Sequence, residues 1–195
     1  MEPTTTLNRI RANDPCRLGW EKLLRNLGKT RGVDETLPFS KILKSNGLID
    51  TLWCMQVEPH YAREWRLFAV WCARQVQHLM TDPKRIALID VAERCALGQI
   101  SKFDMTWERN NAEFSKDPVS DVAWFACDPD AYRAAIDAAW YAEQAMGSAA
   151  AWNDERGFAG ASTWDKAAAD ARAAQTAELL RLLTESSPVT AEQTA

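Results

Sequence analysis

The sequence predicts an all-α protein, a compact bundle of six to eight helices packed around a central helix at residues 60–80. Apolar residues recur at spacings of three and four along several segments, which is the period of an amphipathic helix. Alternating apolar and polar residues, the pattern of a half-buried strand, never continue far enough to predict a sheet. The 195 residues are 47% hydrophobic and 26% charged, so the chain has enough apolar material for the core of one domain.

Asp-Pro pairs and glycines mark the expected helix ends. Aspartate is a good N-cap because its carboxylate accepts a free backbone N–H, and proline suits the first helical position because no N–H is needed there. Glycine adopts the left-handed conformation that often ends a helix. Helix starts are therefore predicted at Asp14-Pro15, Asp82-Pro83, Asp117-Pro118 and Asp128-Pro129. Helix ends are predicted at Gly28, Gly47 and Gly98.

The first part of the chain contains the expected helices 15–27, 40–45, 48–57, 60–80, 83–97 and 101–114. The segment 60–80 is apolar almost all round, which is typical of a helix at the centre of a bundle. Four of its side chains are expected to be buried there: Trp65, Phe68, Cys72 and Val76. The last of these helices begins at Ser101, which forms a capping-box pattern with Asp104.

Composition changes after about residue 120, because alanine occurs 8 times in residues 1–120 and 23 times in residues 121–195. Small alanine faces let helices approach closely, and the tryptophans among them fill the remaining gaps. We expect helices at 129–152 and 164–183, joined by a loop at 153–162. The predicted organisation is a flexible N-terminus at 1–13, one helical domain at 14–185 and a flexible tail at 186–195. Within the domain, 14–120 holds mixed helices and 121–185 holds acidic, Ala/Trp-rich helices.

Residues that bind metals or carry out catalysis are few and scattered. The two histidines, His60 and His78, would lie about 27 Å apart on one helix and so cannot share an ion. The cysteines are interpreted as small apolar packing groups, and Gly28-Lys29-Thr30 lacks the preceding glycine of a phosphate-binding loop. We therefore expect no catalytic residue, no metal and no cofactor, in a protein that is not an enzyme. A small cytoplasmic enzyme of unknown reaction is kept as an alternative.

The expected location is the cytoplasm, of the host cell if the chain is encoded by a phage. An odd number of scattered cysteines, five in all, suits a reducing compartment better than a disulfide framework. No apolar stretch approaches the roughly 18 residues of a membrane span. The segment 1–7 lacks the apolar core of a secretory signal.

Charge is distributed unevenly along the chain. Residues 1–45 hold 9 Lys/Arg and 5 Asp/Glu, whereas residues 101–195 hold 8 and 16. The basic first third could follow a row of phosphates, so direct nucleic-acid binding is a second alternative. The acidic second half favours a protein or nucleoprotein partner with a basic surface, which acidic groups attract at long range.

The candidate partner-binding residues combine this acidic charge with tryptophan, which is enriched at the centres of interfaces. They are Asp117, Asp121, Asp128, Asp130, Asp137, Asp154, Glu155, Trp152 and Trp164. If the carboxylates share one face, their charge pattern is similar to that of nucleic-acid phosphates, and they could occupy a groove that holds a nucleic acid. The alternatives are a solvated face that keeps the protein soluble and an intramolecular match to the basic first third.

Several segments of residues 48–105 form a recognisable pattern: Leu52-Trp53-Cys54, the run from Trp65 to Arg74, Thr81-Asp82-Pro83, and the run from Asp90 to Arg94 with Gly98. This pattern resembles a group of uncharacterised helical proteins of bacteria and phages, some of which are labelled immunity proteins. The chain departs from it at 153–162, where the Ala/Trp tract is interrupted. The motifs are packing and capping residues, so no functional residue is carried over.

The resemblance implies a context of phages, mobile elements and bacterial conflict, where small acidic proteins neutralise a larger machine by binding it, as anti-CRISPR proteins do. We therefore expect a non-enzymatic interaction module, an inhibitor or immunity protein that blocks a basic protein or nucleoprotein partner stoichiometrically.

Overall fold

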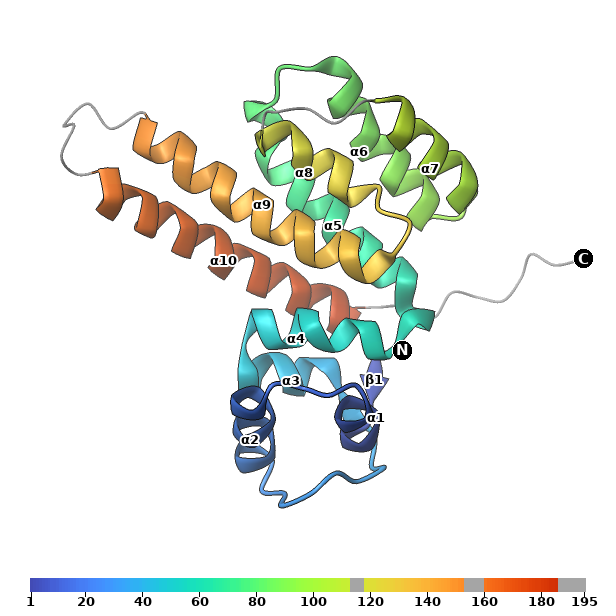
Figure 1. Ribbon diagram of the computed structural model, residues 1–195, viewed down its shortest axis with the longest axis vertical. Coiled ribbons are helices and arrows are strands. Elements are labelled where there is room, and N and C mark those ends of the chain that lie inside the picture. The colour runs from blue at the N-terminus through green and yellow to red at the C-terminus, as the bar shows by residue number, and fades with distance from the viewer. Residues whose placement is uncertain (113–117, 153–159, 186–195) are drawn as a thin grey trace, which may run out of the picture.

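The computed structural model describes residues 1–112, 118–152 and 160–185, and these form the all-α fold that the sequence predicts (Figure 1). The helices are α1 (Leu7–Ala12), α2 (Arg17–Asn26), α3 (Phe39–Asn46), α4 (Leu48–Cys54), α5 (Ala62–Val76), α6 (Pro83–Ala96), α7 (Lys102–Asn111), α8 (Pro118–Ala126), α9 (Ala131–Trp152) and α10 (Gly160–Glu185). Short 3-10 helices lie at η1 (Met55–Val57), η2 (Pro59–Tyr61) and η3 (Gln77–Leu79).

The N-terminal segment differs from its prediction, because residues 1–13 are part of the folded structure rather than a flexible end. Strands β1 (Thr4–Thr5) and β2 (Leu37–Pro38) pair antiparallel, and α1 follows β1 directly. Leu7 and Ile10, on one side of α1, are both buried. The polar residues around them obscured this short apolar face in the sequence. The predicted flexible tail at 186–195 lies outside the described residues.

The central helix of the prediction is α5, which the 3-10 turns η2 and η3 extend at its two ends. The four side chains expected at the centre are confirmed to be buried: Trp65, Phe68, Cys72 and Val76. Helices α6, α8 and α9 pack around α5. Trp65 also reaches α3, where its ring centroid lies 5.0 Å from that of Phe39.

Helices α9 and α10 form a long antiparallel pair (Figure 1). Their close approach depends on Gly147 of α9, because a Cβ atom at this position would lie 2.6 Å from the ring of Trp164 on α10. Further along, the side-chain amide of Gln175 donates to the backbone carbonyl of Ala139 at 2.8 Å. Small residues on α9 and one tryptophan on α10 thus explain the composition of this half of the chain.

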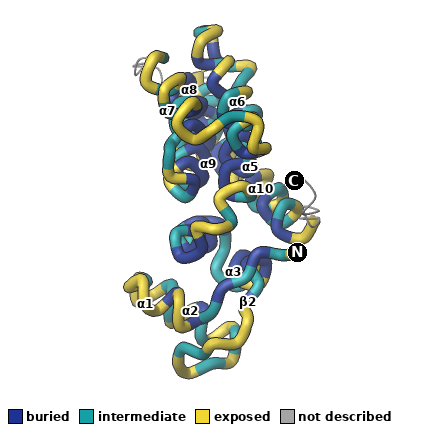
Figure 2. Tube along the Cα trace, turned by 90° about the vertical axis from the view of Figure 1, so that its right-hand side faces the viewer, coloured by how far each residue is buried: buried dark blue, intermediate teal, exposed yellow. Residues whose placement is uncertain are grey.

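This helix pair lies between two groups of elements. Figure 1 shows α5–α8 on one side of the pair and α1–α4 on the other, and α10 contacts α3, α4 and α5. Figure 2 shows buried residues concentrated along α5 and α9, whereas the loop after α2 is largely exposed. The core therefore runs through both groups, and the link between α8 and α9 is at its edge.

Candidate partner-binding surface

The structure does not place all of the predicted acidic residues on one surface. Asp117, Asp154 and Glu155 lie outside the described residues. Asp121 is buried on α8, and its Oδ1 lies 3.9 Å from Nη1 of Arg85, which is also fully buried. Asp121 is therefore a core residue that faces Arg85, and it does not share a face with the acidic residues that follow it.

The two predicted tryptophans also differ from each other. Trp152, at the end of α9, is 90% exposed and is free to contact a partner. Trp164 is half-buried, because its ring packs against Gly147 in the α9–α10 pair. The structure thus keeps Trp152 exposed, as the prediction requires, and gives Trp164 a packing role.

Asp128 and Asp130 lie together in the link between α8 and α9, and the fold holds both carboxylates. Oδ2 of Asp128 accepts a hydrogen bond from Nη2 of Arg109 at 3.0 Å, and its Oδ1 accepts from the backbone N–H of Asp130 at 2.9 Å. Oδ1 of Asp130 accepts from the backbone N–H of Tyr132 at 2.9 Å. Asp130 therefore caps α9, two residues later than the Asp-Pro pair predicts.

Asp137, in the second turn of α9, adds a third carboxylate to this group. Partial burial raises the pKa of the Asp137 carboxyl, and the negative charge of Asp128 raises it further, while Arg133 and Arg109 oppose the shift. Carboxylates that are partly desolvated beside a like charge are more common at functional sites than elsewhere. Asp128, Asp130 and Asp137 are the predicted acidic residues that the structure brings together.

Four aromatic side chains form a continuous row across α8 and α9. The ring centroids of Trp124 and Phe125 are 5.3 Å apart, Phe125 stacks on Tyr141 at 4.4 Å, and Tyr141 meets Trp140 edge-on at 4.7 Å. Trp140 is 52% exposed. Sequence reasoning missed this row, although Trp140 and Tyr141 follow Asp137 at helical spacings of three and four.

Arg109 of α7 connects the aromatic row to the carboxylates. Its guanidinium carbon lies 3.3 Å from the centre of the Trp124 ring, and its Nη2 contacts Asp128. Its Nε donates to the backbone carbonyl of Trp124 at 3.1 Å. One aromatic ring and one carboxylate therefore already hold an arginine within this chain.

We call this region the aromatic–acidic surface; it consists of Phe125, Asp128, Asp130, Asp137, Trp140 and Tyr141. Asp130 and Trp140 are exposed, and the other four are partly buried. The outward face of α9 continues it. At about 100° per residue, the exposed positions Trp140, Ser148 and Trp152 fall within an arc of about 120°. Trp152 lies about 18 Å along the helix axis from Trp140.

A second exposed aromatic pair lies on α7. Phe103 is 77% exposed and Trp107 is 58% exposed, and they are one helical turn apart. The capping box at Ser101 predicts the helix that carries them, but sequence reasoning did not single them out. At about 100° per residue, Trp107 lies about 160° around the axis of α7 from Arg109, so the pair faces away from the aromatic–acidic surface.

The basic first third forms ion pairs with neighbouring carboxylates. Nε of Arg9 lies 2.9 Å from Oε1 of Glu58, and Nζ of Lys29 lies 2.6 Å from Oε2 of Glu35. These two cations are therefore matched by acidic residues of the first 60 positions, and not by the acidic second half.

The cysteines of the core are poor nucleophiles. Burial raises the pKa of the Cys54 and Cys127 thiols to about 12, and it raises the pKa of Cys72 well above its ordinary value. These thiols are protonated near neutral pH. Among the described residues, His, Cys, Asp and Glu form no group of three or more that could hold a metal ion. In the same ranges, no helix is both long and apolar enough to cross a membrane.

Comparison of the chain with protein-family models, curated proteins and solved structures gave no match. The resemblance to immunity proteins therefore stays a prediction, and function has to be inferred from the residues of the surface.

Proposed function

We propose that this protein is a non-enzymatic binding module that blocks a basic protein or nucleoprotein partner by covering part of its surface. The partner docks on the aromatic–acidic surface and its continuation along α9. The observation that carries the proposal is the exposed ring of Trp140, which follows the partly desolvated carboxylate of Asp137 by about one turn of α9. An exposed tryptophan next to a carboxylate is a typical anchor for a partner's arginine or lysine.

The contact of Arg109 inside the chain shows how such an anchor works. Arg109 lies over Trp124 and pairs with Asp128 at the same time. A partner arginine placed over Trp140 and paired with Asp137 would repeat this arrangement at the surface. The combination is worth more than either contact alone, because each one restricts the guanidinium in the geometry that the other requires.

Electrostatics favour a basic group over an acidic or neutral one. The pKa of Asp137 is raised because its charge is partly desolvated and lies near that of Asp128. A partner cation at this position favours the ionised carboxylate and lowers this pKa. Binding is therefore expected to strengthen as pH rises through the pKa of Asp137.

The surface is long enough for a stable complex. The 22 residues of α9 extend over about 33 Å, from the capped start at Asp130 to the exposed Trp152. Interfaces of standard size cover about 800 Å² of each partner, with a few aromatic anchors near the centre. Trp140 lies near the middle of this length and Trp152 at its end.

The proposal is tested by capturing partners from a host lysate on the immobilised protein, with and without nuclease. The informative variants are Asp137→Lys and Trp140→Ala, because both side chains are partly or largely exposed and neither caps a helix. Asp128 and Asp130 are less suitable, since their carboxylates also hold the α8–α9 link. We expect each variant to reduce capture at least tenfold, or about 1.4 kcal/mol.

Asp34→Lys is the matched control, because Asp34 is exposed in the loop after α2 and the charge change is identical. This control should capture the partner as well as the parent does. Equal capture by the parent, Asp137→Lys and Trp140→Ala would rule out the aromatic–acidic surface. Loss of all capture after nuclease treatment, together with equal capture by those variants, would instead favour the nucleic-acid alternative.

A further inference from the structure

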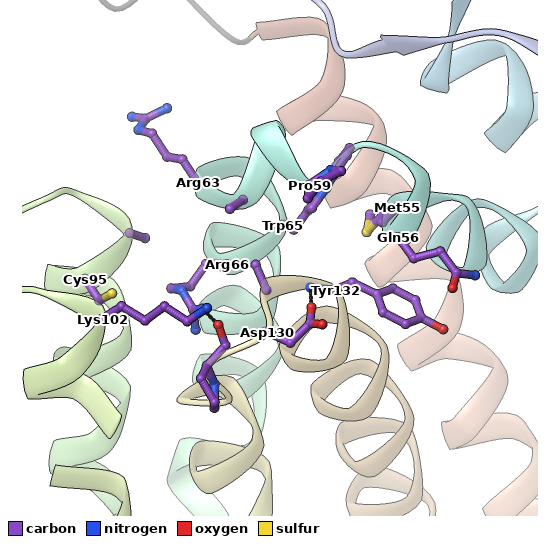
Figure 3. Close-up of a pocket in the computed structure, with 14 residues that line it drawn as sticks. Met55, Gln56, Pro59, Arg63, Trp65, Arg66, Cys95, Lys102, Asp130 and Tyr132 are labelled. Carbon is purple, nitrogen blue, oxygen red and sulfur yellow. Dashed lines mark hydrogen bonds between the residues drawn. The ribbon is translucent and has the colours of Figure 1, made fainter. Parts of the chain in front are cut away.

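A pocket of about 400 Å³ opens where η1, η2 and α5 meet the end of α6, the start of α7 and the α8–α9 link (Figure 3). Its charged lining consists of Arg63, Arg66, Lys102 and Asp130. The volume falls in the range of small-molecule sites, which is roughly 300 to 1,000 Å³. Three cations against one carboxylate make the pocket positive, in contrast to the acidic surface beside it.

Arg66 provides a buried charge for this pocket. It is 5% exposed, and its guanidinium donates to the backbone carbonyls of Ala126 at 3.1 Å, Asp128 at 2.8 Å and Pro129 at 3.5 Å. A guanidinium has five N–H groups, so two are left after these three bonds. Carbonyl oxygens do not neutralise the charge. Burial lowers the pKa of Arg66, and the nearby carboxylates of Asp128 and Asp130 favour its charged form without contacting it in an ion pair within the described part of the chain.

Lys102 brings a second cation toward Arg66, whereas Arg63 lines the pocket with its guanidinium directed away from both (Figure 3). Lys102 is the exposed first residue of α7, and Figure 3 shows its side chain extending toward Arg66. Arg63 is partly exposed, and its contact with Glu64 is long, at 3.5 Å. The N-terminus of α7 lies at the same edge of the pocket, and its capping box with Ser101 and Asp104 already offsets the partial positive charge of the helix end. The carboxylate of Asp130 is engaged by a backbone N–H of α9.

The opposite side of the pocket is apolar and aromatic. Figure 3 shows Pro59, Met55 and Tyr132 on the side away from Lys102. Small-molecule sites commonly have this division, in which a few polar groups orient one end of the ligand and apolar walls cover the rest.

We propose that this pocket binds a small molecule with an anionic head, a phosphate or a carboxylate, and an aromatic or apolar body. The head lies between Arg66 and Lys102, where charge-assisted hydrogen bonds from both cations reach it. The body lies against Pro59 and Tyr132. This site is separate from the proposed partner anchor at Trp140, so either one can exist without the other.

The test is calorimetric titration of the whole chain with phenyl phosphate, benzoate, inorganic phosphate and phenol. We expect saturable binding of phenyl phosphate or benzoate. The compound that binds more tightly shows whether the pocket prefers a phosphate or a carboxylate as the anionic head. Phenol lacks the charge and inorganic phosphate lacks the body, so each is expected to bind at least tenfold more weakly. Absence of binding by both aromatic anions, or equal binding of phenol, would overturn the proposal.

Variants locate the binding to this pocket. Lys102→Met removes one cation from an exposed position and is expected to weaken binding of the preferred anion at least tenfold. Arg63→Met is expected to have a smaller effect, because the Arg63 guanidinium is directed away from Arg66 and Lys102. Lys84→Met is the matched control, because Lys84 is exposed near the start of α6, away from the pocket. Equal affinity of Lys102→Met and of the control Lys84→Met for the anion would show that the anion binds elsewhere and would overturn the assignment.

Discussion

At the scale of single residues, Asp137 shows how the fold changes the electrostatic environment of a carboxylate. In the sequence it is one of many carboxylates in an acidic half. In the fold it is partly buried near Asp128, and both effects raise its pKa. A raised carboxyl pKa means that the ionised form is less favourable in the folded than in the unfolded chain.

Asp137→Asn is therefore expected to stabilise the protein near pH 7. The parent is destabilised above the raised folded-state pKa of Asp137, and this effect disappears below the ordinary aspartate pKa, where both states are protonated. Thermal melts near pH 7 should place the variant above the parent, and melts at about pH 3 should bring the two together. A variant that melts below the parent near pH 7 would contradict the assigned desolvation.

Trp65 is the residue on which the core depends most. It is 1% exposed, its ring contacts Phe39, and its Nε1 donates to the backbone carbonyl of Glu58 at 3.2 Å. We expect Trp65→Ala to lower the free energy of unfolding by about 3–5 kcal/mol, the range of large aromatic truncations in cores. Urea unfolding followed by circular dichroism measures the change, and an unchanged midpoint would show that Trp65 is not central.

At the scale of elements, the α9–α10 pair includes a close contact between a small and a large residue, Gly147 and Trp164. Gly147 is costly for a helix on intrinsic grounds, by about 1 kcal/mol relative to alanine. It is accommodated because Trp164 occupies the space where a Cβ atom would be. The two positions are therefore expected to be energetically coupled.

Gly147→Ala tests this coupling through a change of sign. In the parent it is expected to destabilise by about 1–3 kcal/mol, because the new methyl group overpacks against Trp164. In a Trp164→Leu background the same change is expected to stabilise, since only the helix propensity of alanine remains. The two pairs of unfolding free energies give the result, and equal effects in both backgrounds would disprove the contact.

At the scale of the whole molecule, the acidic second half creates a negative electrostatic field in the surrounding solvent, in addition to its local contacts. Association with a basic partner should therefore depend on salt, because the Debye length falls from about 10 Å at 0.1 M to about 3 Å at 1 M. We expect the association rate of the captured partner to fall at least tenfold over this range, and to fall less for Asp137→Lys. An association rate that does not change with salt would leave only the aromatic contacts.

Much of the fold could be predicted because helices are local. The spacing of Trp65, Phe68, Cys72 and Val76 identifies a buried helix whatever lies around it, and the Ser101–Asp104 capping box is confirmed in full. The sequence pattern did not predict α1, whose two buried side chains stand among polar residues, and residues 1–13 were expected to be flexible. Six residues of helix give too short a pattern to recognise.

The candidate site could be predicted only in part, because its geometry joins residues from three helices. The acidic composition pointed to Asp128, Asp130 and Asp137, which do lie near one another. Nothing local in the sequence distinguishes Asp121, which is buried against Arg85, from these three. The stacking of Phe125 on Tyr141 depends on how α8 and α9 cross, which periodicity does not encode.

The sequence by itself determined the helical class, the central helix, most helix starts and the acidic second half, since each of these depends on residues close together in the chain. The tertiary structure alone decided which charges face inward, how the aromatic row forms and where Arg66 and Lys102 meet to make a positive pocket. These features depend on contacts between residues tens of positions apart. Such contacts are set by helix packing, which depends on the whole core and not on any single segment.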